Sequence, residues 1–160
     1  MIAVGDRLPE TSFFVLKEGR PQKVPSDAIF AGRRIVLFGV PGAFTPTCTL
    51  NHLPGFLEHS HAIREKGVDE IAVVAVNDAN VMDAWAEATG GRGRILYLSD
   101  GNAEFALATG LDLDSTGVGR GLRMKRFLMI VEDGVVTALN VEDTTAEAEK
   151  SGAARILEQL

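Results

Sequence analysis

The stretch Val40-Pro41-Gly42-Ala43-Phe44-Thr45-Pro46-Thr47-Cys48 (VPGAFTPTC) is a turn rich in proline and glycine that ends at the only cysteine of the 160-residue chain. The apolar run at 35–40 precedes it and has the length and β-branched content of a buried strand. Beyond it, apolar residues recur at helical spacing as far as Ile63. The sequence therefore places Cys48 where a strand ends and a helix begins.

Cys48 has the setting of a reactive thiol. At a helix start, unpaired backbone N–H groups and the helix dipole favour the thiolate, which predicts a pKa lowered from about 8.5 toward roughly 5–6. The alternative is a structural cysteine, since free cysteines are often simply buried. The polar segment Thr45-Pro46-Thr47 argues against an apolar, buried setting, so we favour the reactive interpretation.

The composition predicts one globular domain over residues 1–160, because 46% of the residues are hydrophobic and only 24% are charged. A net charge of −6 gives no electrostatic case for binding nucleic acid. No apolar run reaches the length of a membrane span, and the first residues lack a secretory pattern, so we expect no membrane partner.

A single cysteine excludes a disulfide within the chain and a Cys-x-x-Cys dithiol site. It fits a reducing cytoplasm, which is the location we expect. His59 and His61, with Glu58, lack a convincing metal-site spacing, so we expect neither a metal nor a cofactor.

The order of apolar runs and turn residues predicts a layered α/β domain with a mixed sheet. The segment 1–30 is expected to be irregular with a candidate hairpin, and 111–121 to be a long mobile loop. Strands are predicted at 35–40, 70–76, 95–98, 126–131 and 135–141, the last two joined by an Asp-Gly hairpin turn. Helices are predicted at 48–66 with a kink at Pro54, 81–90, 102–109 and 146–160. The last helix is expected to pack through Ala153, Ile156, Leu157 and Leu160.

The turn, followed by His52-Leu53-Pro54-Gly55-Phe56, closely resembles the active-site segment of type II, or peroxiredoxin-5-like, peroxiredoxins. The family's Pro-x-x-x-Thr-x-x-Cys spacing falls on Pro41, Thr45 and Cys48. The resemblance covers nearly the whole chain, continuing through Val76-Asn77-Asp78, Val81-Met82, Lys125-Arg126-Phe127 and Ala138-Leu139-Asn140-Val141-Glu142. It implies a thioredoxin-like fold, with a central mixed β-sheet flanked by helices on both faces, and homodimers formed through the active-site end.

The same resemblance implies a thiol peroxidase that reduces hydrogen peroxide and small organic hydroperoxides in cell redox homeostasis, with peroxynitrite as a further candidate substrate. Such a reaction needs an ionised sulfur, donors that align the peroxide and positive charge near its oxygens. Cys48 is the expected nucleophile, and Pro41 can shield it from water. The Thr45 hydroxyl could position the peroxide or cap the helix, and the sequence favours neither role. The other motif residues expected at the substrate site are Gly42, Phe44, Thr47 and His52.

A persistent positive charge beside the sulfur calls for an arginine. The sequence offers Arg120, Arg123 and Arg126, and spacing cannot choose among them. The resemblance of Lys125-Arg126-Phe127 to the family's arginine segment selects Arg126, with Arg123 as the runner-up.

His52 lies four residues after Cys48 and so on the same helix face, which also allows a cysteine hydrolase in which His52 is the base. We favour a histidine packed behind the site, because no oxyanion-hole motif accompanies the pair.

The positions that resemble the family's resolving cysteines are Val73 and, approximately, Lys150. We therefore expect a one-Cys enzyme whose sulfenic acid is reduced by glutathione, glutaredoxin or thioredoxin. A redox sensor that oxidises without rapid turnover is the remaining alternative.

Overall fold

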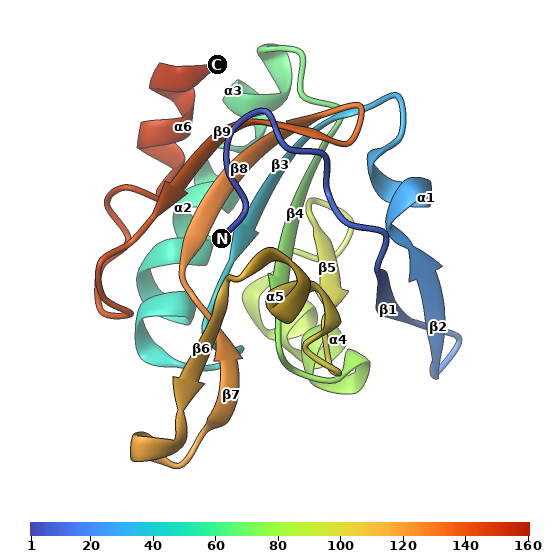
Figure 1. Cartoon of the computed structure of the whole chain (residues 1–160), viewed down its shortest axis with the longest axis vertical. Coiled ribbons are helices and arrows are strands. Elements are labelled where there is room, and N and C mark those ends of the chain that lie inside the picture. Colours follow the sequence, from blue (N-terminus) through green and yellow to red (C-terminus); the bar gives the residue numbers. More distant parts are fainter.

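The computed structural model describes residues 1–160 and has one seven-stranded sheet with helices on both faces (Figure 1). The strand order is β2-β1-β5-β4-β3-β8-β9. The bounds of these strands are β1 Ser12–Lys17, β2 Arg20–Pro25, β3 Arg34–Gly39, β4 Glu70–Ala75, β5 Leu96–Ser99, β8 Phe127–Glu132 and β9 Val135–Val141. β3, β4 and β5 pair in parallel, and the remaining pairs are antiparallel. The predicted α/β fold with a mixed sheet is confirmed.

Apart from a charged residue at one end, the central strands β3, β4 and β8 are apolar, because both faces of the sheet are covered. Val36 and Phe38 of β3 belong to a core shared with α2 (Leu53–Glu58), α3 (Ser60–Glu65), α4 (Ala79–Thr89) and α6 (Ala153–Gln159). Ile35 and Leu37 point to the opposite core, which includes α1 (Ser26–Phe30) and α5 (Glu104–Thr109). β3 ends at Gly39, between these two cores, and the turn before Cys48 follows it directly.

The expected loop at 111–121 is instead part of a small second sheet. β6 (Asp112–Ser115) pairs antiparallel with β7 (Gly121–Met124), and the 3-10 turn η2 (Thr116–Val118) joins them. This β6–β7 arm extends from the lower end of the molecule in Figure 1. It brings the chain directly to Arg126, which lies between β7 and β8.

The predicted helix at 48–66 is wrong in its continuity. A π-helical turn, η1 (Cys48–His52), comes first, and α2 and α3 follow with a break at His59. The predicted helix at 146–160 begins only at Ala153, so residues 143–152 form an irregular segment. Figure 1 shows α2, α3 and α6 gathered on one side of the sheet, and the three helices contact one another.

The N-terminal hairpin and the Asp-Gly turn are present, and α1 is an element that was not predicted. Asp133 and Gly134 both have positive φ, at 48° and 78°, as a two-residue hairpin turn requires. No helix in the structure combines the length and apolar character needed to cross a membrane.

Candidate active site

The turn after β3 is fixed to the neighbouring strand and to itself. The Ala43 amide donates to the side-chain oxygen of Asn77, just beyond β4, at 2.9 Å. The Thr45 hydroxyl donates to the Gly42 carbonyl at 2.7 Å, and the Thr45 carbonyl accepts from the Thr49 amide at 3.0 Å. Thr45 therefore does not cap the helix with its side chain. Its hydroxyl is engaged as a donor, and its lone pairs remain available as acceptors.

Cys48 opens the π-helical turn, in which its carbonyl accepts from the amide of Leu53, five residues on. Single π-turns of this kind occur frequently at functional sites. The Cys48 side chain is completely buried, so the expectation that Thr45-Pro46-Thr47 would keep it out of an apolar setting is wrong. Its sulfur lies at the edge of the core that contains Phe38 and Phe56.

Arg126 is buried together with this sulfur and is only 2% exposed. Its Nη2 donates to the Cys48 sulfur at 3.0 Å. The same guanidinium donates through Nε and Nη2 to the Thr145 carbonyl, at 3.3 and 3.1 Å, and Nη1 contacts Nδ1 of His52 at 2.8 Å. Because a guanidinium keeps its charge, this contact places a permanent positive charge against the Cys48 sulfur.

His52 stands behind Arg126, and both of its ring nitrogens are occupied. A guanidinium can only donate, so Nδ1 is the acceptor; Nε2 then carries the proton and donates to the Ser151 carbonyl at 2.8 Å. Burial first, and then the charge of Arg126, lower the pKa of His52 from 6.5 to about 3. A neutral histidine with no free nitrogen cannot serve as a base for Cys48, which argues against the hydrolase alternative.

The other predicted residues occupy distinct places around this centre. Pro41 and Gly42 are buried, Thr45 and Thr47 are half-buried, and Phe44 is exposed with a positive φ of 63°. Of the three candidate arginines, Arg126 alone forms a hydrogen bond with the sulfur.

The runner-up, Arg123, lies beside the turn rather than on the sulfur. It donates to the carbonyls of Val76, at 3.2 Å, and Arg120, at 2.8 Å. A Cβ built on Gly42 would lie 3.5 Å from its Nη1. Arg120 is exposed.

Several site residues escaped the sequence reasoning. The carbonyls of Thr145 and Ser151 are backbone acceptors, which any residue type supplies, so they leave no signal in the sequence. Trp85 is fully buried, and its indole N–H donates to the Thr49 hydroxyl at 3.1 Å. This bond ties α4 to the turn that carries Cys48.

Neither resolving position offers a thiol near the site. Val73 is buried in β4, and Lys150 pairs through Nζ with Asp143 at 2.6 Å. No group of three His, Cys, Asp or Glu side chains is arranged to hold a metal ion.

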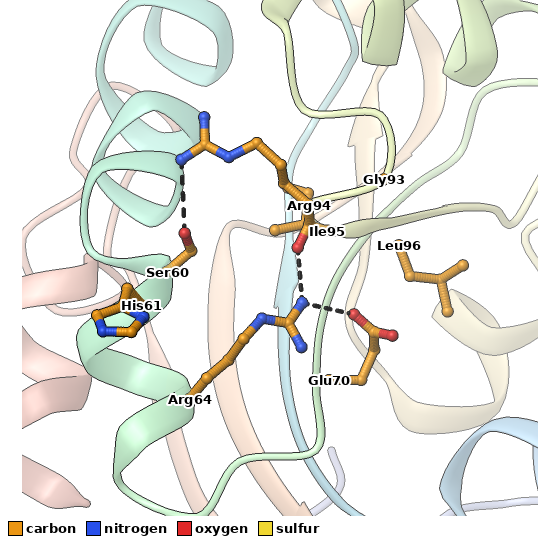
Figure 2. Close-up of a pocket in the computed structure, with 8 residues that line it drawn as sticks. All are labelled: Ser60, His61, Arg64, Glu70, Gly93, Arg94, Ile95 and Leu96. Carbon is orange, nitrogen blue, oxygen red and sulfur yellow. Dashed lines mark hydrogen bonds and ion pairs between the residues drawn. The ribbon is translucent and has the colours of Figure 1, made fainter.

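A pocket of about 520 Å³, drawn in Figure 2, lies apart from this chemistry, at the ends where β4 and β5 begin. Arg64 donates there to Glu70 at 2.9 Å and to the Arg94 carbonyl at 2.6 Å. The pocket is lined by no cysteine, and none of its lining residues forms a hydrogen bond with the side chain of Cys48 or Arg126. The reactive centre is therefore the buried Cys48–Arg126 pair.

The buried thiol held against a guanidinium indicates a thiol-reactive protein. The mixed sheet with helices on both faces indicates a thioredoxin-like fold. Comparison with known proteins agrees: the Redoxin family model matches residues 3–157. The chain belongs to the redoxin family and is a peroxiredoxin, a thiol-dependent peroxidase. The resemblance stated from the active-site motif is thereby confirmed.

The similar proteins match along nearly the whole chain. Peroxiredoxin-2E-2, chloroplastic, of Oryza sativa subsp. japonica is 48% identical, with 93% of this chain and 70% of that protein covered. Peroxiredoxin-2C of the same organism is 41% identical, with 99% and 98% covered.

Two solved structures show the same fold. Reduced Prx3 of Vibrio vulnificus in complex with H2O2 has a TM-score of 0.93 at 47% identity, with 99% of each chain covered. Peroxiredoxin 5 of Alvinella pompejana has a TM-score of 0.88 at 30% identity, with 99% and 97% covered.

Proposed function

We propose that this peroxiredoxin reduces hydrogen peroxide and small organic hydroperoxides by a one-Cys mechanism in which Cys48 is the nucleophile. The single observation that carries the proposal is the 3.0 Å contact between Nη2 of Arg126 and the Cys48 sulfur. Burial alone would favour the neutral thiol, and a guanidinium buried beside it favours the thiolate instead. The pair therefore supplies an anionic sulfur with positive charge where a peroxide oxygen would arrive.

In the proposed reaction the Cys48 thiolate attacks one peroxide oxygen, forming an S–O bond as the O–O bond breaks. The sulfur is oxidised by two electrons to a sulfenic acid, and the departing oxygen leaves as water or alcohol after taking a proton. Arg126 stabilises the charge that grows on the departing oxygen. Thr45 accepts from the peroxide O–H, because its own proton is donated to the Gly42 carbonyl. Pro41, buried beside the turn, shields the sulfur.

The sulfenic acid is proposed to be reduced by an external thiol. The attacking thiolate forms a mixed disulfide with Cys48 and releases water, and a second thiol then frees Cys48 and leaves as a disulfide. The absence of any other cysteine in the chain supports this route. Glutathione, glutaredoxin and thioredoxin are the candidate donors, and a reducing cytoplasm is the proposed location.

Access to Cys48 requires movement, because its side chain has no exposed surface. A protein thiol must reach within bonding distance of the sulfur, so we infer that the segment 44–50 opens in the oxidised enzyme. The exposed side chains of Phe44 and Leu50 mark the outer face of this segment, at 53% and 79% exposure.

Those two exposed apolar side chains also support a proposed homodimer that forms through the active-site end, because a partner surface there would remove them from water. Replacing Leu50 with aspartate is expected to lower the molar mass measured by light scattering to that of a monomer. A monomeric wild-type protein would contradict the homodimer. A wild-type dimer whose mass is unchanged in Leu50→Asp would contradict an interface at Leu50.

The decisive assay follows peroxide consumption by wild-type protein with glutathione plus glutaredoxin and, separately, with thioredoxin plus its reductase. Turnover with one donor system and none for Cys48→Ser supports the proposal and identifies the donor. Full activity in Cys48→Ser would refute the assignment of the nucleophile. Rapid oxidation of Cys48 without turnover in either system would instead favour the redox sensor.

A further inference from the structure

Glu142, the residue after β9, places a buried carboxylate behind the active site and has no cation as its partner. Its side chain is part of a residue only 7% exposed. Oε1 accepts from the Lys150 amide at 3.1 Å, and Oε2 accepts from the amide and the hydroxyl of Ser151, both at 2.6 Å. The Lys150 ammonium group turns away to Asp143. A buried carboxylate is costly unless it is hydrogen-bonded, and these three bonds take the place of a cation.

The contacts of Glu142 close a ring that includes the catalytic arginine. The Glu142 amide donates to the Arg126 carbonyl at 3.0 Å. The Glu142 carboxylate holds Ser151, whose carbonyl accepts from Nε2 of His52, and Nδ1 of His52 accepts from Nη1 of Arg126. All four members of the ring are buried. Glu142 is therefore linked to Arg126 in two ways. One link is a direct backbone hydrogen bond, and the other runs through Ser151 and His52.

We propose that Glu142 is a positioning residue for peroxide reduction and acts on Cys48 through Ser151, His52 and Arg126. By fixing the Ser151 carbonyl, it holds the proton of His52 on Nε2, so that the Nδ1 lone pair faces Arg126. The other tautomer would point an N–H at the guanidinium, which can only donate, and would push Nη1 away. Nη2 would then lose its place beside the sulfur.

Glu142 also orders the segment that supplies the other support of Arg126. The Thr145 carbonyl accepts two guanidinium bonds and lies in the irregular segment 143–152. The Glu142 carboxylate binds the far end of this segment through Lys150 and Ser151. One side chain thus supports both groups, His52 and the Thr145 carbonyl, that hold the guanidinium against Cys48. This inference relies on the proposed role of Arg126 in the reaction.

Glu142→Gln tests the proposal with little change of shape. The amide has one acceptor oxygen, and its NH2 group would face a backbone N–H of Lys150 or of Ser151, so the three hydrogen bonds of the carboxylate cannot all be kept. We expect the second-order rate constant for Cys48 oxidation by hydrogen peroxide to fall about tenfold, a loss typical of a charge-assisted hydrogen bond. We also expect the pH titration of the thiolate, followed by its ultraviolet absorbance, to move to higher pH.

Asp143→Asn is the matched control, because it removes a neighbouring carboxylate that bonds only the exposed Lys150 ammonium group. This variant should keep both the rate constant and the thiolate titration of the wild type. A Glu142→Gln protein that loses thermal stability but keeps both readouts would overturn the proposal, since a purely structural residue behaves in that way.

If Glu142→Gln does not fold, Ser151→Ala provides the second test. It removes only the hydroxyl bond to Glu142 and leaves the carbonyl that holds His52. A smaller change of both readouts in the same direction supports the proposal, and no change in either one overturns it. Failure here is separate from failure of the proposed function, because the proposed function is tested by the peroxide turnover of wild-type protein and the inactivity of Cys48→Ser, which do not involve the Glu142 and Ser151 variants.

Discussion

His52 should make the folded protein lose stability as the pH falls below neutrality. Its pKa is lowered from 6.5 to about 3 by burial and then by the charge of Arg126. In the unfolded chain the ring takes up a proton near its ordinary pKa, whereas in the folded protein it stays neutral until about pH 3. The stability is therefore fully present above pH 6.5 and is lost progressively as the pH falls toward 3.

The size of the effect follows from the depressed pKa. Each pH unit between the two pKa values costs about 1.4 kcal/mol of unfolding free energy. From about pH 7 to about pH 5, His52 should therefore remove about 2 kcal/mol. Burial raises the pKa of Asp100, and a raised carboxyl pKa changes stability with pH in the opposite sense to His52. A comparison of variants is needed to isolate His52.

Urea unfolding at the two pH values, with wild type and His52→Asn side by side, provides that comparison. Asparagine keeps a side-chain oxygen facing Arg126 but has no proton to gain. The wild type should lose about 2 kcal/mol more than His52→Asn between the two pH values. His61→Asn is the control, since His61 is exposed and pairs only with Glu65, and it should behave as the wild type. Equal losses in wild type and His52→Asn would refute a buried, neutral His52.

Three further changes test the charge near the sulfur, at Arg126 and Arg123, and the packing of the central sheet, at Gly39. Arg126→Lys should slow Cys48 oxidation by at least about tenfold in stopped-flow kinetics, because an ammonium cannot serve the sulfur, His52 and Thr145 together; a rate within twofold would contradict this. Arg123→Gln, beside the turn but off the sulfur, should cost clearly less in the same assay, and an equal loss would reverse the ranking of the two arginines. Gly39→Ala should lower the unfolding free energy by about 1–3 kcal/mol, since the added methyl would overlap the buried ring of Phe127; unchanged urea unfolding would show that the ring can move.

The central sheet could be predicted from the sequence because its signals are local. The run at 35–40 is apolar, as is the run at 70–76 after its first residue, Glu70, and such strands are stable between two layers of helices. The Asp133-Gly134 turn sets its own geometry through two residues that tolerate positive φ. Neither feature depends on a partner far away in the chain.

The predicted helix boundaries were wrong where a side chain from a distant part of the chain forms a hydrogen bond with a backbone group of the helix. Arg94, 37 residues away, donates to the Leu57 carbonyl at 2.6 Å, and the Ser60 hydroxyl donates to it at 3.1 Å. The helix can therefore break at His59 without leaving that carbonyl unpaired. Glu142 similarly takes the amides of Lys150 and Ser151, and the last helix begins beyond them. The β6–β7 arm escaped prediction because its glycine and aspartate residues read as a loop and its pairing is visible only in three dimensions.

The active site shows how far residue type can lead. The motif around Cys48 indicated the nucleophile, but its arginine lies 78 residues away, and only resemblance distinguished Arg126 from Arg123. The polar neighbours of Cys48 suggested a less buried thiol because a side chain's polarity was taken to report its surroundings. Thr45 instead satisfies its hydroxyl on the Gly42 carbonyl, inside the turn. A polar segment whose hydrogen bonds are internal can cover a buried cysteine, and such a cysteine stays chemically useful only when a charge is buried with it. Arg126 is that charge, and the groups that hold it in place decide whether burial of Cys48 protects a reactive thiolate or an inert thiol.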